Sequence, residues 1–183
     1  MRGLRCLAAL ALLLAAGRAG AQEVNDALGL DAFFGHWRGT AIGQRADEPT
    51  TGYGVRDLDV RISETTDGFE IAWTTVIQAA GVAAEDAEPK RRRTSARFVQ
   101  TGPAVWQGES TDGPGVGLSR SWARLEGRSL TVYVLEIDEA GLYDLSRYAR
   151  TISPAGVMDL KFTRTRDGAA LRRVTGSLLP AAD

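Results

Sequence analysis

The stretch RDLDVRISETTDGFEIAWTTVI, residues 56–77, decides the fold class of this chain. Its first half places Leu58, Val60 and Ile62 at every second position between charged residues, which is the period of a half-buried β-strand. An Asp-Gly dipeptide follows, and this pair readily takes the positive φ angles of a tight turn. The second half alternates again, with Trp73 among the apolar residues of one face. We therefore predict a β-hairpin.

The same pattern recurs on both sides of this hairpin. About ten short alternating segments follow one another at a spacing of about 10–14 residues, separated by turn-forming residues. No segment shows the period of an amphipathic helix. Such a train of strands with hairpin connections is typical of an up-and-down antiparallel β-barrel, a closed sheet without exposed edges. We expect an all-β fold of about 8–10 strands in one domain, residues 31–183, after a short N-terminal helical turn.

Residues 1–21 have the pattern of a secretory signal peptide. Two arginines precede an apolar run over residues 7–16, and small residues end at Ala21, where a signal peptidase would cleave. The apolar run is shorter than the roughly 20 residues that a membrane-spanning helix needs. We predict that the chain is exported, to the periplasm or out of the cell, with residues 22–30 as a loose lead.

The composition excludes several classes of function. Cleavage after Ala21 removes Cys6, the only cysteine, so the mature chain has no thiol for catalysis or metal binding. It keeps 19 basic and 23 acidic residues, a formal net charge of −4, which gives no overall attraction for nucleic acid. The single histidine, His36, belongs to no spaced cluster of metal ligands, and no nucleophile elbow accompanies it. We predict no metal, no cofactor, no catalytic residues and no enzymatic activity.

The segment FFGHWRGTAIG, residues 33–43, is predicted to lead into the first strand. Asp31 can cap a preceding helical turn through its carboxylate, and Gly35 lets the chain bend out of that turn. Trp37 is expected to point into the barrel, and His36 to point outward, towards solvent or an N-terminal cover. The next residues on the Trp37 face are small, namely Gly39, Ala41 and Gly43. They line either the floor of an empty pocket or a packed corner.

This opening resembles that of the lipocalins, in which a short turn is followed by Gly-x-Trp at the start of the first barrel strand. The matching residues here are Gly35 and Trp37. The wider calycin group, with the fatty-acid-binding proteins, avidins and nitrobindin-like haem barrels, shares this architecture. The resemblance implies a calycin-like barrel in which a late arginine packs across Trp37, and Arg150, Arg164 and Arg166 are the candidates. Nitrobindin-like barrels bind haem through a late histidine, which this chain lacks.

The segment SRYAR, residues 146–150, carries the candidate ligand site. Tyr148 and Arg150 lie on one face of a predicted strand, where a guanidinium and a phenol together can hold a carboxylate. The resemblance to fatty-acid-binding proteins, which pair Arg and Tyr in their last strands, implies the same role. With the aromatic residues Trp73 and Tyr133, these two residues form the predicted ligand-binding set. The alternative is that they face solvent, or that the arginine packs on the opening tryptophan.

These features predict a non-catalytic exported barrel that binds a small hydrophobic or amphipathic molecule, and a carboxylate on that molecule is one group that Tyr148 and Arg150 could hold. An alternative is a ligand-free barrel that binds an envelope protein through its loops, residues 78–93 and 108–117. A minor alternative is haem binding or isomerase-type activity. The basic run PKRRR, residues 89–93, is expected in a solvated loop, or as a contact for an anionic group at the barrel mouth.

Overall fold

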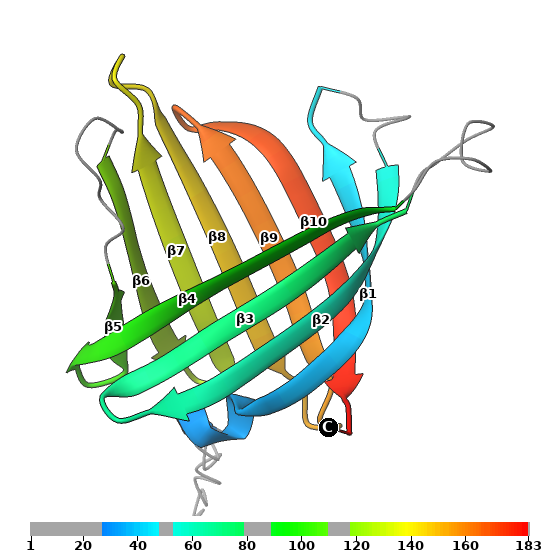
Figure 1. The fold of residues 1–183 in the computed structure, drawn as a ribbon, viewed down its shortest axis with the longest axis vertical. Coiled ribbons are helices and arrows are strands. Elements are labelled where there is room, and N and C mark those ends of the chain that lie inside the picture. The colour runs from blue at the N-terminus through cyan, green and yellow to red at the C-terminus, as the bar shows by residue number, and fades with distance from the viewer. Residues whose placement is uncertain (1–26, 48–52, 79–88, 110–117, 183) are drawn as a thin grey trace, which may run out of the picture.

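The computed structural model describes residues 27–47, 53–78, 89–109 and 118–182. The predicted signal peptide, most of the N-terminal lead and most of the two loops predicted to bind a partner lie outside these residues. A short 3-10 helix comes first and ten strands follow (Figure 1). Their bounds are η1 (Leu30–Phe33), β1 (Gly35–Arg45), β2 (Tyr53–Thr65), β3 (Gly68–Ile77), β4 (Lys90–Gly102), β5 (Val105–Gly108), β6 (Leu118–Glu126), β7 (Ser129–Ile137), β8 (Tyr143–Ile152), β9 (Met158–Arg166) and β10 (Ala169–Pro180).

The ten strands close into one barrel in the order β1-β10-β9-β8-β7-β6-β5-β4-β3-β2. Strands that follow one another in sequence pair antiparallel, and the ring closes where β1 pairs with β10. The hairpin predicted from residues 56–77 forms as β2 and β3, with Thr65 opposite Gly68 at its turn. The predicted all-β up-and-down barrel is therefore confirmed, and so is the helical turn before it.

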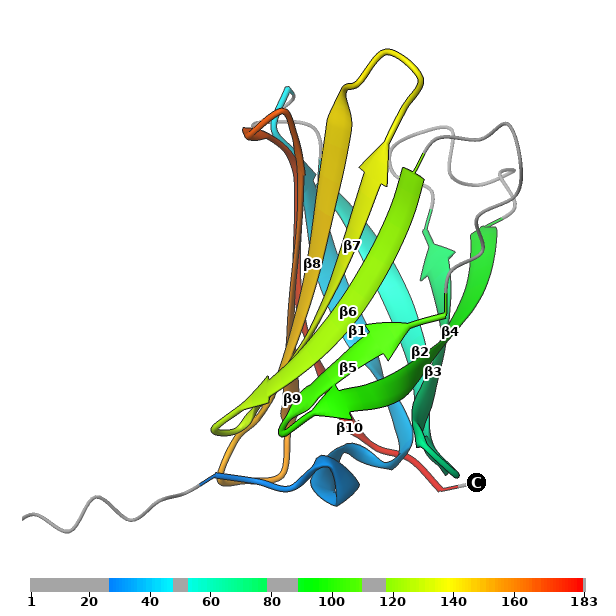
Figure 2. The same ribbon diagram turned by 90° about the vertical axis from the view of Figure 1, so that its left-hand side faces the viewer.

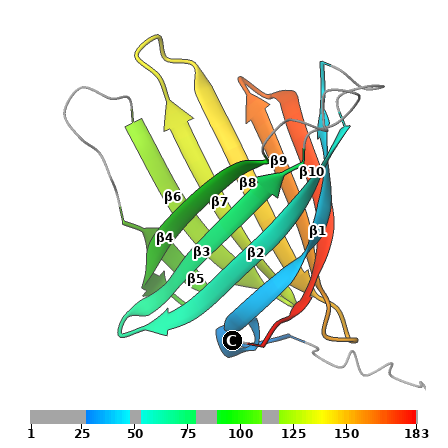
Figure 3. The same ribbon diagram turned by 45° about the vertical axis from the view of Figure 1, so that its right-hand side comes forward.

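One end of the barrel is covered by η1. Figures 2 and 3 place η1 at the end where β1 begins and β10 ends. Phe33 of η1 is fully buried, and Trp37 of β1 donates from Nε1 to the Phe33 carbonyl oxygen at 3.0 Å. Gly35 between them has a φ of +125°, a conformation that glycine takes without strain. We call this end the capped end, and the opposite end, where β1 ends and β2 begins, the far end.

The predicted role of Asp31 in η1 is wrong. The residue before η1 is Gly29, and no side chain caps the turn. Asp31 lies inside the turn, where its backbone carbonyl accepts a hydrogen bond from the Phe34 N–H at 3.1 Å. Because a side-chain cap requires the extended residue just before the helix, a start at Leu30 removes Asp31 from that position.

The capped half of the barrel is a packed apolar core. Phe69 stacks on Phe98 with 4.9 Å between the ring centroids, and Trp106 meets Phe69 edge-on at 5.7 Å. Further large side chains with at most 1% exposure are Phe33, Ile62, Ile71, Leu130, Met158 and Leu178. Burying each of these side chains contributes about 1.5–3 kcal/mol. This packing holds the fold together and confines any functional interior to the part nearer the far end.

The small residues of β1 do not line an empty space. A Cβ atom added at Gly39 would meet the carbonyl oxygen of Ser177 and lie 2.8 Å from the Cα atom of Leu178, both in the paired strand β10. A Cβ atom added at Gly43 would lie 2.6 Å from Nε and 2.7 Å from Nη2 of Arg56. The backbone of β10 therefore occupies the space beside Gly39, and the Arg56 side chain occupies the space beside Gly43.

Strand β5 has four residues, and the pairing of its neighbours is incomplete. β4 meets β5 only from Phe98 onward, and β6 meets β5 only from Trp122 onward. Within the described residues, 90–96 of β4 and 118–121 of β6 therefore have strand partners on one side only (Figure 2).

The basic run at residues 90–93 lies in strand β4 and pairs with β3 as far as Ile77. Placing this basic run in a loop is wrong, because the alternation of β3 carries the pairing through it.

Candidate functional site

Polar and basic side chains line the interior of the barrel towards the far end. Strand alternation puts them there, because Arg56 shares its face of β2 with the buried Leu58 and Val60. In the same way, Arg172 shares its face of β10 with the buried Val174. The inward rows of β8 and β9 also run from the core into charged residues. They comprise Asp144, Ser146, Tyr148 and Arg150 on β8, and Phe162, Arg164 and Arg166 on β9.

Water reaches this part of the interior. Trp73, Tyr148 and Phe162 face inward and pack against the core, but each is only partly buried. The side chain of Arg164, further along the inward row of β9, is 39% exposed. Ile62, which faces inward nearer η1, is 1% exposed. The solvated part of the interior, where aromatic faces meet basic groups, is the candidate site.

Arg150 is a buried cation in this site. The residue is 3% exposed, and its guanidinium carbon lies 6.0 Å from the centre of the Trp73 ring and 5.7 Å from that of Tyr148. Its Nη1 atom has no hydrogen-bond partner among the described residues. Burial lowers the pKa of Arg150 to about 10, and only Tyr148 among the described groups acts against that shift. Aromatic faces therefore hold this charge, and no described carboxylate neutralises it.

The aromatic rings of the site come from three strands. Trp73 of β3 lies 5.7 Å from Tyr148 of β8, and Tyr148 lies 4.6 Å from Phe162 of β9, centroid to centroid. Burial raises the pKa of the Tyr148 hydroxyl, and the Arg150 charge acts in the opposite direction. The phenol is therefore neutral at physiological pH and can donate a hydrogen bond beside the guanidinium. The structure thus brings together three of the four predicted ligand-site residues, Trp73, Tyr148 and Arg150.

The fourth predicted residue, Tyr133, lies outside the barrel. It stacks on Trp122 with 5.0 Å between ring centroids and 10° between the ring planes, and Trp122 is 36% exposed. Including Tyr133 in the ligand site is therefore wrong. The buried Leu130 and Val132 define the alternation of β7 and put Tyr133 on its outer face. That alternation was a sufficient signal to exclude it.

No described arginine makes the cation–π contact with Trp37 that the lipocalin resemblance implies. Arg150 packs on Trp73 and Tyr148 instead. The other two candidates, Arg164 and Arg166, form ion pairs with a carboxylate. The N–H of the Trp37 indole is used by the carbonyl of η1. Trp37 lies in the core, as predicted, but no described arginine packs on its ring.

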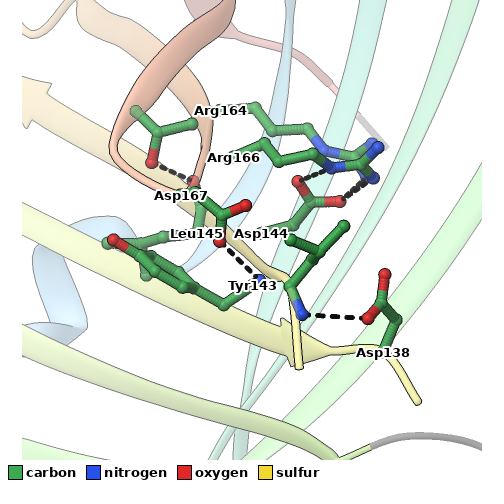
Figure 4. Close-up of polar contacts among 9 residues, drawn as sticks. Asp138, Tyr143, Asp144, Leu145, Arg164, Arg166 and Asp167 are labelled. Atoms are coloured by element: carbon green, nitrogen blue, oxygen red, sulfur yellow. Dashed lines mark hydrogen bonds and ion pairs between the residues drawn. The ribbon is translucent and has the colours of Figure 1, made fainter. Parts of the chain in front are cut away.

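The carboxylate bound by those two arginines is Asp144, which the sequence reasoning missed. Figure 4 shows the side chains of Arg164 and Arg166 converging on it from β9. Arg164 Nη2 donates to Asp144 Oδ2 at 2.5 Å, and Arg166 donates from Nη2 to Oδ2 at 2.7 Å and from Nε to Oδ1 at 3.0 Å. Arg166 first, then Arg164, lowers the pKa of Asp144 to about 2. Arg164 and Arg166 thus occupy both oxygens of this carboxylate.

Two further interior arginines, Arg56 and Arg172, were also missed. Arg56 is 8% exposed, and the Nε atoms of both residues are buried without a hydrogen-bond partner among the described residues. Burial lowers the pKa of each guanidinium, and the like charge of Arg92 lowers both further. Arg172 also lowers the pKa of Arg56. These residues form a cluster of like charges nearer the far end than Arg150.

His36 lies on the outer face of β1, as predicted, but it is buried there. Its side chain is 5% exposed, and Nε2 lies 3.0 Å from Asp59 Oδ1. Arg38 Nε donates to Asp59 Oδ2 at 2.8 Å. Burial of Asp59 opposes ionisation, but the hydrogen bonds from Arg38 and His36 outweigh it and lower the pKa of the carboxyl. The arrangement ties β1 to β2 and lies apart from the interior site.

The described residues contain no group of three or more His, Cys, Asp or Glu side chains placed to hold a metal ion. None of their helices has the length and apolar character needed to cross a bilayer.

The fold and the site define a closed ten-stranded antiparallel barrel with a solvated, basic and aromatic interior near one end. No protein-family model matches the sequence, and no curated protein matches it. Among solved structures, the chain is similar to the S-type phycobiliprotein lyase CPES from Guillardia theta. The two are 10% identical with a TM-score of 0.35, over 89% of this chain and 98% of that one. At this TM-score the likeness supports no inference about ligand, activity or family.

Proposed function

We propose that this chain is an exported, non-catalytic barrel that binds a small amphipathic molecule in its interior. The observation that carries the proposal is Arg150, a guanidinium 3% exposed with an unpartnered Nη1 among the described residues. Export rests on the signal-peptide pattern of residues 1–21 alone.

An anionic group beside Arg150 would relieve two costs. An uncompensated buried charge costs several kcal/mol, and an unsatisfied buried donor costs about 1–3 kcal/mol. A carboxylate would accept from Arg150 Nη1 and from the neutral Tyr148 hydroxyl, whose ring lies 5.7 Å from the guanidinium carbon. The site therefore favours an acid over a neutral molecule of the same shape.

The aromatic faces favour an apolar body on that acid. Trp73, Tyr148 and Phe162 present partly exposed ring surface to the interior. An alkyl or ring system lying against them removes that surface from water, at about 25 cal/mol for each Å² buried. A buried cation with aromatic walls thus suits an amphipathic acid that enters head first.

Titration calorimetry with dodecanoate and its methyl ester tests this function. We expect the acid to bind and the ester to bind at least tenfold more weakly. Arg150→Met should weaken dodecanoate binding by about 10–150-fold, since hydrogen bonds to a charged group contribute about 1.5–3 kcal/mol. The same substitution should change the affinity for the methyl ester little, because the ester carries no charge.

Arg147→Met is the matched control. Arg147 lies three residues away on the same strand, but it is exposed on the outer face. We expect it to leave dodecanoate binding unchanged. Failure of dodecanoate to bind the wild-type protein, or equal losses in the two variants, would contradict the proposed function.

One observation favours a second candidate, a barrel that binds a protein partner. Trp122 is 36% exposed and stacks on Tyr133 on the outer face of β6 and β7, an arrangement that interfaces use. Trp122→Ser would then abolish capture of an envelope protein while leaving dodecanoate binding intact. Unchanged capture would rule out this face.

A further inference from the structure

We propose that the barrel interior holds a second anion subsite, formed by Arg56 and Arg172, so that its ligand carries two separate acidic groups. This inference rests on the proposed function and deepens it. It assigns the ligand to amphipathic dianions, molecules with an apolar spacer between two acids. The first acid would lie at Arg150 and the second nearer the far end.

The position of Arg56 is the first support. Its side chain is buried with the residue 8% exposed, and Nε has no hydrogen-bond partner among the described residues. The guanidinium lies across Gly43, where an added Cβ would be 2.6 Å from Nε and 2.7 Å from Nη2. The Arg56 guanidinium can lie in the interior because Gly43 has no side chain that would occupy the same space.

The charge balance around Arg172 is the second support. Arg172 lies opposite Arg164 in the register of β10 and β9, and its Nε is also buried without a partner. Arg164 and Arg166 share the carboxylate of Asp144. Like charges therefore gather here without a described anion for Arg56 or Arg172. In the unliganded protein, repulsion between these like charges and their burial lower stability, and a bound oxyanion would offset both effects.

The register separates the two subsites. Arg150 lies opposite Leu160, and Leu160 lies opposite Gly176. Arg172 is four residues from Gly176 towards the far end of β10, which is about 13 Å at the usual rise of a strand. Tyr148 lies between them in the register, because it is opposite Phe162, and Phe162 is opposite Val174, midway between Gly176 and Arg172. One small acid cannot occupy both subsites, but a molecule with two acids can.

The experiment compares dodecanedioate with dodecanoate by titration calorimetry, on the full mature chain. We expect the wild-type protein to bind the diacid at least tenfold more tightly than the monoacid. Arg172→Met and Arg56→Met should each reduce diacid affinity about to that of the monoacid. Neither should change monoacid affinity, because the first subsite remains intact.

Two further variants keep the test sharp. Arg173→Met, at the neighbouring exposed position on the outer face of β10, is the matched control and should preserve the diacid preference. Gly43→Ala keeps every charge but forces the Arg56 guanidinium to move. It should weaken the diacid preference several-fold, and it separates the placement of the charge from its presence.

The outcomes distinguish the two proposals. Equal binding of diacid and monoacid to the wild-type protein, or a diacid preference that survives both arginine substitutions, overturns the second subsite and leaves the proposed function standing. Failure of both acids to bind overturns the proposed function and the second subsite with it. Loss of the preference in the Arg56 and Arg172 variants, with monoacid binding kept, supports the inference.

Discussion

Replacing Arg150 by methionine should stabilise the unliganded protein, although the residue lies in the interior. Burial lowers the pKa of Arg150 to about 10, and the cost of keeping its charge in the folded state is about 3 kcal/mol. The substitution also removes the cation–π contacts with Trp73 and Tyr148, and this loss lowers the expected gain in stability by about 1–2 kcal/mol. Methionine keeps an unbranched apolar side chain in the same volume. We therefore expect Arg150→Met to raise the free energy of unfolding by about 1–2 kcal/mol.

Guanidinium chloride unfolding at pH 7, followed by tryptophan fluorescence and circular dichroism, measures this difference. The melting temperature should rise by about 2–8 °C for a domain of this size. Arg147→Met, on the outer face, should change stability by less than about 0.5 kcal/mol. If Arg150→Met unfolds more easily than the wild-type protein without ligand, the charge is compensated and the reasoning about the site is refuted.

Three other outcomes follow from the packing and the charges. Asp144→Asn should cost about 1 kcal/mol at pH 7, since the arginines around it are partly solvated. The pKa of Asp144 lies at about 2, below its unfolded value, so this difference should shrink as the pH falls from about 4 to 2 in urea unfolding. Gly39→Ala should cost about 1–3 kcal/mol by overpacking against Ser177, whereas Gly102→Ala, where an added Cβ meets nothing, should be near neutral in the same assay. Trp37→Phe should lower the unfolding free energy by about 1–3 kcal/mol, because the Phe33 carbonyl loses a buried hydrogen bond.

Alternation in the sequence was enough to predict the barrel. Residues 56–77 show two alternating runs around an Asp-Gly turn, and the same pattern recurs for each strand pair. Alternation also placed Trp37 in the core and paired Tyr148 with Arg150 on one face. These features depend on the period of a single strand, which is visible in one sequence.

The features that were missed depend on contacts between strands. Arg56 reaches its position because Gly43 of the neighbouring strand leaves room for it, and only the register reveals that meeting. The inward face of Arg172 cannot be counted from the preceding turn, because a bulge shifts the register between Ala170 and Arg172. Asp144 gains its importance from two arginines on the next strand.

The incomplete pairing beside β5 bears on self-association of the protein. Residues 90–96 of β4 have no strand partner on the β5 side within the described residues, and an unpaired strand offers its N–H and C=O groups to any other chain. Residues 90–93 read KRRR, so a second copy pairing there would bring runs of like charge to about 5 Å from each other. The basic run therefore opposes edge-to-edge self-association, and neutralising it would promote aggregation before it affected folding.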